Sequence, residues 1–451
     1  MRILLKDAAA RALDYLDGVQ TRSVAPLPQA VAGLGRLNQP LPEQPSRPEE
    51  VLRVLDETCS DATMAMAGPR FFGFVIGGSL PAALAANWLA SAWDQNSAYY
   101  QAMPATSYVE QVALRWVLEL FHLPAACGGA FVTGGTMANF CALAAARHVV
   151  LKRAGWDVEA SGLIGAPPVT LVISDEAHPS VTKSLGLLGF GRNRAVRVPT
   201  DPQGRMRATA LPRISGPTIV CTQIGNVNTG AFDPVSDIAE VVHRQAAWLH
   251  VDGAFGLWAA AVPAMNRLVT GVALADSWAT DFHKWLNVPF DSGLALVRDA
   301  DALRAAMAIT AEYLPTDSTF RNPADYVPEL SRRARGVEVW AALRALGRAG
   351  VIELVERNCR QARRFAEGLR AAGYEILNDV VLNQVLVSFG DAQMTNKVIA
   401  AIQADGTCWC GGTVWQGRTA MRISVCSFAT TDDDVELSLK TMLRIAKKRK
   451  Q

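Results

Sequence analysis

The fold is decided by residues 248–256, WLHVDGAFG, in which a short apolar run ends in an aspartate and is followed by small residues. Five other short apolar runs are each followed by a polar or glycine-rich cluster and then by a helical segment. Buried strands that alternate with helices predict a largely parallel α/β sheet. The other runs are Ala130–Val132, Val169–Ile173, Thr218–Cys221, Ser277–Ala279 and Leu294–Val297.

The pattern divides the chain into three predicted parts. Residues 1–60 begin with a helical stretch, Asp7–Leu16, and then loosen into a Pro-rich stretch, Pro26–Pro48, which predicts an extended arm. Residues 61–345 carry the alternating runs and form the predicted large domain. Residues 346–451 begin with a long amphipathic helix and predict a small α+β domain. Its expected strands are 374–377, 384–389 and 420–425, and its other expected helices are 395–402 and 432–446.

The charge balance argues against a nucleic-acid or membrane partner. Lysine and arginine number 44 against 42 acidic residues, and the net charge of +2 creates no strong field for a polyanion. The one basic run, Lys447–Lys450, is typical of a solvated helix end. Charged residues precede any apolar stretch of signal-peptide length, and no run approaches the roughly 20 apolar residues of a membrane span. We therefore expect a cytoplasmic protein.

The cysteines are scattered through the chain and do not form a framework. There are eight in 451 residues, a usage typical of reduced thiols. Cys408 and Cys410 are separated by one residue and have no nearby histidine, so we expect no metal site there.

A candidate phosphate cradle follows the first apolar run. Residues 133–139, TGGTMAN, lead into an Ala-rich helix. Glycines let the backbone approach an anion, and the helix N-terminus offers free N–H groups and a partial positive charge. The Thr136 hydroxyl can add a hydrogen bond. The alternative is an ordinary glycine turn with a capping threonine. Gly135 and Thr136 are therefore candidate phosphate ligands.

Polar residues also follow the run Val169–Ile173 and end the run at residues 248–252. Asp252 ends its run, and a buried carboxylate there needs a cationic or hydrogen-bonding partner. Asp252 could keep a pyridine nitrogen protonated, with the small Ala254 letting a ring lie flat, or it could cap the next helix. His178 follows the second run, where an imidazole either stacks on a flat ring or is a satisfied structural residue.

The run Ser277–Ala279 is followed by residues 280–289, TDFHKWLNVP. A lysine that follows a histidine at a strand end, between aromatic residues, can attack an aldehyde. His283 and Lys284 therefore complete a series that begins with the phosphate cradle and continues with His178 and Asp252. In this order the series indicates pyridoxal 5'-phosphate (PLP) as the cofactor and an amino acid as the substrate.

Further similar segments extend along the chain, and on them it resembles the group II PLP-dependent decarboxylases. This is the family of the aromatic amino-acid, glutamate and histidine decarboxylases. The resemblance implies a type I PLP-dependent transferase fold, like that of aspartate aminotransferase, and an obligate homodimer with active sites at the subunit interface. It implies decarboxylation of an L-amino acid to the amine and CO2. The segments are 69–74 with Pro104 and Glu110, then 133–139, 174–180, 249–254, 283–285, 331–347, 422–424 and 430–434.

The resemblance also implies a role for each of the residues already singled out. Lys284 forms the Schiff base with the cofactor, Asp252 pairs with the pyridinium nitrogen, and His178 stacks on the ring. Gly135 and Thr136 hold the phosphate.

A further histidine and a loop are matched by the same resemblance. His283 adjoins the cofactor. Residues 311–327 match the family's mobile loop, and Tyr313 falls where decarboxylases keep a catalytic tyrosine. We expect Tyr313 to return a proton to the α-carbon after CO2 leaves.

Some positions depart from the family. Asn226 and Asn228 stand where many members have Gly-Thr-Thr, and Asp281 stands where aromatic decarboxylases often place Asn, so their contacts with cofactor or substrate stay open. Arg70 and Arg335 are candidates either for meeting an acidic substrate or for a subunit interface.

Three alternatives to decarboxylation stay open on the same scaffold. The first is aldehyde synthesis, which a phenylalanine at position 313 would favour. The second is another PLP reaction such as transamination. The third is a catalytically idle protein with a binding role.

Overall fold

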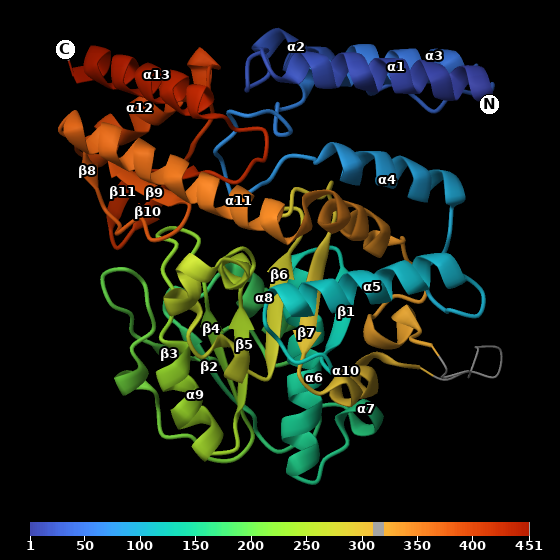
Figure 1. Ribbon diagram of the computed structural model, residues 1–451, viewed down its shortest axis with the longest axis vertical. Coiled ribbons are helices and arrows are strands. Elements are labelled where there is room, and N and C mark those ends of the chain that lie inside the picture. Colours follow the sequence, from blue (N-terminus) through green and yellow to red (C-terminus); the bar gives the residue numbers. More distant parts are fainter. Residues whose placement is uncertain (310–319, 451) are drawn as a thin grey trace. The chain divides into compact units, whose positions relative to one another are not determined.

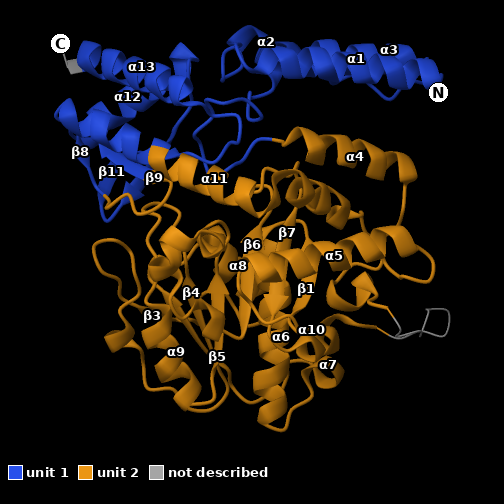
Figure 2. Ribbon diagram, viewed as in Figure 1, with its two compact units in different colours: residues 1–78, 361–377, 385–451 blue, residues 79–360, 378–384 orange. Residues whose placement is uncertain are grey.

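The computed structural model describes residues 1–309 and 320–450, and the chain forms two compact units (Figures 1 and 2). One unit contains residues 1–78, 361–377 and 385–451, and the other contains residues 79–360 and 378–384. The domain boundaries expected from the sequence stay a prediction. Within the described part of the chain, none of the helices has the length and apolar character needed to cross a membrane.

The larger unit is built on a seven-stranded sheet with the order β1-β7-β6-β5-β4-β2-β3. β7 is antiparallel to both of its neighbours, and the other neighbouring pairs are parallel. The predicted, largely parallel sheet is therefore confirmed. Its strands are β1 (Gly128–Val132), β2 (Thr170–Ser174), β3 (Val196–Val198), β4 (Thr218–Gln223), β5 (Trp248–Asp252), β6 (Ser277–Asp281) and β7 (Gly293–Val297).

Apolar side chains cover both faces of this sheet, as expected for parallel strands. On one face α6 (Gly135–Arg153) packs against β5, β6 and β7, and its many alanines allow a close approach. The other face carries aromatic rings: Phe131 stacks on Phe282, which meets Trp258 edge-on. The other α-helices that lie wholly in this unit are α4 (Pro81–Trp93), α5 (Pro104–Leu120), α7 (Val158–Ser161), α8 (Pro179–Leu187), α9 (Val235–Arg244) and α10 (Ala300–Met307).

The smaller unit combines a four-stranded sheet with helices. The strand order is β10-β11-β9-β8, with β10 antiparallel to β11 and β8 antiparallel to β9. The strands are β8 (Glu375–Ile376), β9 (Gln384–Ser388), β10 (Gly411–Trp415) and β11 (Arg418–Ser424), and the helices are α1 (Arg2–Val19), α2 (Pro28–Gly33), α3 (Pro48–Cys59), α12 (Ala392–Asp405) and α13 (Asp432–Lys450).

Two helical segments differ in detail from the sequence-based expectation. The Pro-rich stretch contains α2, because Pro28 takes a first-turn position where its missing N–H costs no hydrogen bond. The helix expected from about residue 346 is part of α11 (Arg335–Ala371), which is interrupted at Gly347. Gly347 has φ +59°, a backbone conformation that glycine adopts without strain.

Candidate active site

A cavity of about 340 Å³ lies at the carboxyl ends of strands β1, β2, β5 and β6 in the larger unit. Parallel strands end at the same edge of a sheet, and ligand sites of open α/β sheets lie at that edge. The cavity brings together most of the residues singled out in the sequence, whereas Asp252 is not part of its lining and accepts a hydrogen bond from the backbone N–H of Ala254, which is. Its lining comprises Thr133, Gly134, Gly135, Thr136, Met137, His178, Ser180, Ala254, Asp281, His283, Lys284 and Phe290.

The turn between β1 and α6 has the form of an anion cradle. Gly134 has φ +153°, and a Cβ there would lie 2.9 Å from Cε1 of His283. A Cβ on Gly135 would lie 3.0 Å from Oδ2 of Asp281. Gly134 is the N-cap of α6 and no side chain caps the helix, so a capping threonine does not account for this turn. The first N–H groups of α6 are left to bind an anion.

The Asp252 carboxylate ends β5 and is held by neutral donors. Oδ2 accepts a hydrogen bond from Nδ2 of Asn139 at 3.1 Å and one from Oγ of Ser180 at 3.4 Å. Oδ1 accepts from the backbone N–H of Ala254 at 3.2 Å. Asp252 is not the cap of the following 3-10 helix, whose N-cap is Phe255. None of the described residues forms an ion pair with Asp252, and a buried carboxylate of this kind suits a cationic ring nitrogen.

His178 lines the cavity and also begins α8. Its Nδ1 accepts the backbone N–H of Ser180 at 3.2 Å and lies 2.7 Å from the Ser180 hydroxyl. This places the histidine as the N-cap of α8 (Pro179–Leu187). The structural and functional interpretations of His178 are therefore compatible, because the ring is fixed by its own helix and still faces the cavity.

Lys284 lies three residues beyond the end of β6 and is paired with the last residue of that strand. Its Nζ is 2.8 Å from Oδ2 of Asp281, and its side chain is 19% exposed. The Phe255 ring centroid lies 5.9 Å from the same nitrogen. The lysine therefore offers a primary amine to the cavity, and Asp281 is its anionic partner. The sequence had left the role of Asp281 open.

His283 is fixed beside Lys284 by contacts that the sequence did not suggest. Its Nδ1 accepts the backbone N–H of Ser292 at 3.2 Å, and its ring stacks on Phe290 with centroids 4.4 Å apart. Nε2 lies 3.6 Å from Oδ1 of Asp281. Burial is the main cause that lowers the pKa of His283, so the ring is neutral near pH 7.

Several other expected residues lie elsewhere. Oδ1 of Asn226 accepts the backbone N–H groups of Asn228 and Thr229, so this asparagine shapes a turn, and neither asparagine lines the cavity. Arg70 pairs with Asp434 at 3.0 Å in the smaller unit, and Arg335 pairs with Asp291 at 3.0 Å in the larger one. Tyr313 lies outside the described residues.

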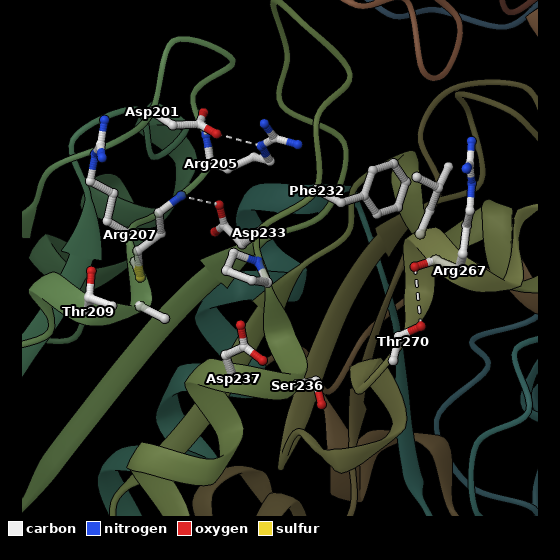
Figure 3. Close-up of a pocket in the computed structure, with 14 residues that line it drawn as sticks. Asp201, Arg205, Arg207, Thr209, Phe232, Asp233, Ser236, Asp237, Arg267 and Thr270 are labelled. Carbon is white, nitrogen blue, oxygen red and sulfur yellow. Dashed lines mark hydrogen bonds and ion pairs between the residues drawn. The ribbon is translucent and has the colours of Figure 1, made fainter.

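A second hollow in the larger unit is bigger, with a volume of about 640 Å³ (Figure 3). It is lined by parts of residues 201–209, 232–237 and 267–270 and shares no lining residue with the strand-end cavity. Two of its carboxylates are already engaged. Asp201 pairs with Arg205, and the buried Asp233 accepts the backbone N–H groups of Met206 and Gln223. No lysine is among its described lining residues, so the smaller cavity is the better place for an amine-bound cofactor.

The strand-end cavity fits PLP group by group. The uncapped helix N-terminus suits its phosphate, the Asp252 carboxylate suits its ring nitrogen, and the Lys284 amine suits its aldehyde. The tight approach of Gly134 to His283 shows that the cradle tolerates no side chain at that position.

Comparisons with known proteins agree with this chemistry. The model of the pyridoxal-dependent decarboxylase conserved domain matches residues 33–390. The chain is 26% identical over 463 residues to an aromatic-L-amino-acid decarboxylase of Bacillus atrophaeus, covering 98% of this chain and 94% of that protein. It is 30% identical over 428 residues to an L-2,4-diaminobutyrate decarboxylase of Rhizobium meliloti (strain 1021), covering 90% and 84%.

The fold agrees as well. The crystal structure of Oryza sativa TDC with PLP and tryptamine superposes with a TM-score of 0.91 at 24% identity, covering 99% of this chain and 97% of that chain. The expected type I PLP fold is therefore confirmed. Because the family model spans most of the sequence, the chain belongs to the pyridoxal-dependent decarboxylases and is a PLP-dependent carboxy-lyase acting on amino acids.

Proposed function

We propose that Lys284 is the residue to which PLP becomes attached, and that the strand-end cavity is where an L-amino acid loses CO2 to give its amine. The observation that carries this assignment is the position of the Lys284 amine. It lines the same cavity as the uncapped N-terminus of α6, with the Asp252 carboxylate behind Ala254.

Each residue of the proposed site then has a separate role. The N–H groups of Gly135 and Thr136 hold the phosphate at the helix N-terminus. Asp252 accepts a hydrogen bond from the protonated ring nitrogen, and His178 lies against the ring. Bound PLP supplies an electron-withdrawing ring that makes loss of CO2 from the α-carbon possible.

Proton transfer to the α-carbon is the remaining task, and we assign it to Tyr313. The assignment rests on the family resemblance at this position, since Tyr313 lies outside the described residues. A phenol that delivers the proton leads to amine, whereas oxygen reaching the same carbon leads to aldehyde.

A homodimer is part of the proposal. The N-terminal helices α1 and α3 carry large apolar side chains in contact with solvent, and a second copy of the chain would bury them. Light scattering should give the mass of a dimer, and a fully active monomer would contradict this part. The residues concerned are Ile3 (80% exposed), Leu5 (61%), Leu13 (53%), Val51 (54%) and Leu55 (53%).

We also propose that the protein works in the cytoplasm. All eight cysteines are free thiols, and every one but Cys59 is buried. Such usage suits a reducing compartment. Cell fractionation would test this, and recovery of the protein with intermolecular disulfides from an oxidising compartment would contradict it.

Reduction of the loaded enzyme tests the attachment site. Borohydride should fix the cofactor covalently, and peptide mapping should recover it on Lys284, because a reduced carbon–nitrogen bond survives digestion. Lys284→Ala should hold PLP weakly and show no turnover. Lys183→Ala, which removes an exposed lysine of α8, is the matched control and should behave as wild type. Recovery of the label on another lysine would refute the assignment.

Tyr313→Phe tests the proton donor and the aldehyde alternative together. Amine formation should fall by roughly 10²- to 10⁴-fold, as for a lost general acid, while PLP binding persists. Part of the remaining flux should appear as aldehyde, ammonia and peroxide. Measuring amine and aldehyde in one assay decides the matter, since an unchanged amine yield without aldehyde would make Tyr313 a bystander. A panel of common amino acids assayed for CO2 release would identify the substrate.

A further inference from the structure

A continuous series of buried hydrogen bonds lies behind Asp252, on the side away from the cavity. Nε1 of Trp248 donates to Oγ of Ser277 at 2.9 Å, and Nδ1 of His250 lies 2.9 Å from the same hydroxyl. Nε2 of His250 lies 2.8 Å from Oδ1 of Asn139, whose Nδ2 donates to Oδ2 of Asp252 at 3.1 Å. All five side chains are almost fully buried.

The secondary structure explains why these residues meet. Trp248, His250 and Asp252 alternate along β5, so their side chains lie on one face of the strand. Ser277 is the partner of His250 in the register between β5 and β6. Asn139 comes from the first turns of α6, the helix whose N-terminus forms the anion cradle. One helix thus supports both ends of the cofactor site.

The carboxylate end of the series and the single proton of a neutral imidazole fix the direction of the hydrogen bonds between Asp252 and Ser277. An indole N–H can only donate, and an ionised carboxylate can only accept. The Asn139 amide must therefore turn its N–H towards Asp252 and its oxygen towards His250. The imidazole then carries its proton on Nε2, and Nδ1 accepts the Ser277 hydroxyl.

The protonation state of His250 fits this direction. Burial lowers the pKa of His250 to about 4, so the ring is neutral near pH 7 and carries a single proton. The opposite direction would place the Asn139 oxygen against the Asp252 carboxylate. That arrangement is stable only if the carboxyl group carries a proton, and it could then no longer accept one from a ring nitrogen.

We propose that His250, Asn139 and Ser277 are positioning residues, which set the orientation of the Asp252 carboxylate and keep it a pure acceptor for the ring nitrogen of PLP. The proposal rests on the role of Asp252 proposed above. The hydrogen bonds of the series link all three residues to Asp252, and none of the three lines the cavity, so we assign their effect to the position of that carboxylate.

The tautomer of His250 is the most direct test, and it does not depend on activity. The chain has six histidines, so ring-¹⁵N labelling gives a spectrum in which a His250→Gln sample assigns one ring. Between about pH 5.5 and 8 the His250 ring should stay neutral, with its proton on Nε2, in the apo and the PLP-loaded protein. A ring protonated on Nδ1, or on both nitrogens at pH 7, would overturn the proposal.

Paired variants test the functional consequence. His250→Gln keeps a donor towards Asn139 and an acceptor towards Ser277, whereas His250→Leu removes both. We expect kcat to fall about 10- to 100-fold in His250→Leu, the range seen when the hydrogen-bond partner of a metal ligand is lost, and only a few-fold in His250→Gln. Equal losses in the two variants would refute the positioning role.

A second pair remains informative if His250→Leu does not fold. Ser277→Ala removes a hydroxyl from the series. Thr222→Val removes a hydroxyl of similar burial on β4, which bonds the His250 backbone carbonyl at 3.2 Å but lies outside the series. Ser277→Ala should lower kcat and let the proton of His250 move between Nδ1 and Nε2, while Thr222→Val should do neither. Similar kcat values in the two variants would count against the proposal.

PLP methylated at its ring nitrogen separates this proposal from the assignment of Asp252 itself. The methylated ring is cationic whatever the state of the carboxylate. The ratio of turnover with methylated PLP to turnover with PLP should therefore be higher in Ser277→Ala than in wild type. If Asp252→Ala keeps full turnover, the assignment of Asp252 fails. If Asp252→Ala is inactive but Ser277→Ala matches wild type in turnover and tautomer, only the positioning role fails.

Discussion

Two buried carboxylates end adjacent parallel strands of the larger unit, and their surroundings are opposite. Asp252 ends β5 and accepts hydrogen bonds from neutral groups, among them the amide of Asn139 and the backbone N–H of Ala254. Asp281 ends β6 and faces the ammonium of Lys284 at 2.8 Å. Its Oδ1 accepts no hydrogen bond from the described residues. The two side chains are 5% and 2% exposed, so burial does not distinguish them.

The difference shows how one sheet edge provides two kinds of anion. Neutral donors fix the position of Asp252 without neutralising its charge, which remains available to a cationic ring. The charge of Asp281 is matched by the Lys284 ammonium, which must lose a proton before its nitrogen can attack an aldehyde, so this ion pair changes when the cofactor is loaded. We therefore infer that Asp252 is a static element of the site and that Asp281 exchanges partners during loading.

The largest effect is expected from removing the static carboxylate. Asp252→Ala should lower kcat by about 10²-fold or more, because a preorganised charge in a site with little water contributes strongly to catalysis. The loss of folding stability should be only about 1–3 kcal/mol, the cost of leaving the Asn139 amide without its acceptor. Steady-state kinetics and urea unfolding of the same sample measure both. Near wild-type turnover would remove the distinction between the two aspartates.

Lowering the pH should reduce the stability of the folded protein through His250, the histidine linked to Asp252 by hydrogen bonds. The pKa of His250 is about 4 in the folded protein, because burial disfavours the charged ring, and about 6.5 in an unfolded chain. The unfolded state therefore takes up the proton first as pH falls. The stability that this histidine contributes is complete above about pH 6.5 and is lost between there and about pH 4, a change of roughly 3 kcal/mol.

His250→Gln provides the measurement for this effect, since glutamine does not titrate. Urea unfolding at pH 7, 5.5 and 4.5 should show that wild type loses more stability than the variant as pH falls. A difference in unfolding free energy that stays constant over this range would mean that His250 does not titrate as described.

The sequence was sufficient to single out the strand-end residues of the candidate site. Gly135, Asp252 and Lys284 follow or end short apolar runs, and the chemistry of an anion cradle, a ring-nitrogen partner and an amine is local to each segment. Strand ends of a parallel sheet converge, so local signals were enough to bring these residues together. The family resemblance then gave them roles.

The residues behind the cavity could not be found in this way. His250 lies inside the run that decides the fold, and its importance depends on Ser277 of the neighbouring strand and Asn139 of α6. Such contacts depend on strand register and on helix rotation, which a single sequence does not specify. The strands β3 and β10 were also missed. β3 has three residues, two of them exposed, and β10 is not continuously apolar, so neither has the signature of a buried strand.

The smallest effect is expected from the exchanging carboxylate. Asp281→Asn keeps the size of the side chain and an oxygen that can accept from Lys284, but it removes the charge. The lysine is 19% exposed and can regain water, so removing the ion pair should cost about 1 kcal/mol, as for a weak ion pair. This free energy corresponds to a change of about fivefold in the rate of PLP attachment.

The direction of that effect separates the two carboxylates. Attachment of PLP should be faster in Asp281→Asn, by about fivefold at most, because the Lys284 amine is no longer held in an ion pair before it attacks the aldehyde. Stopped-flow absorbance after mixing apoprotein with PLP measures this rate. Asp291→Asn is the matched control, since it removes a carboxylate of the same segment that pairs with Arg335 and does not line the cavity. An Asp281→Asn protein that no longer attaches PLP would show that Asp281 is as indispensable as Asp252.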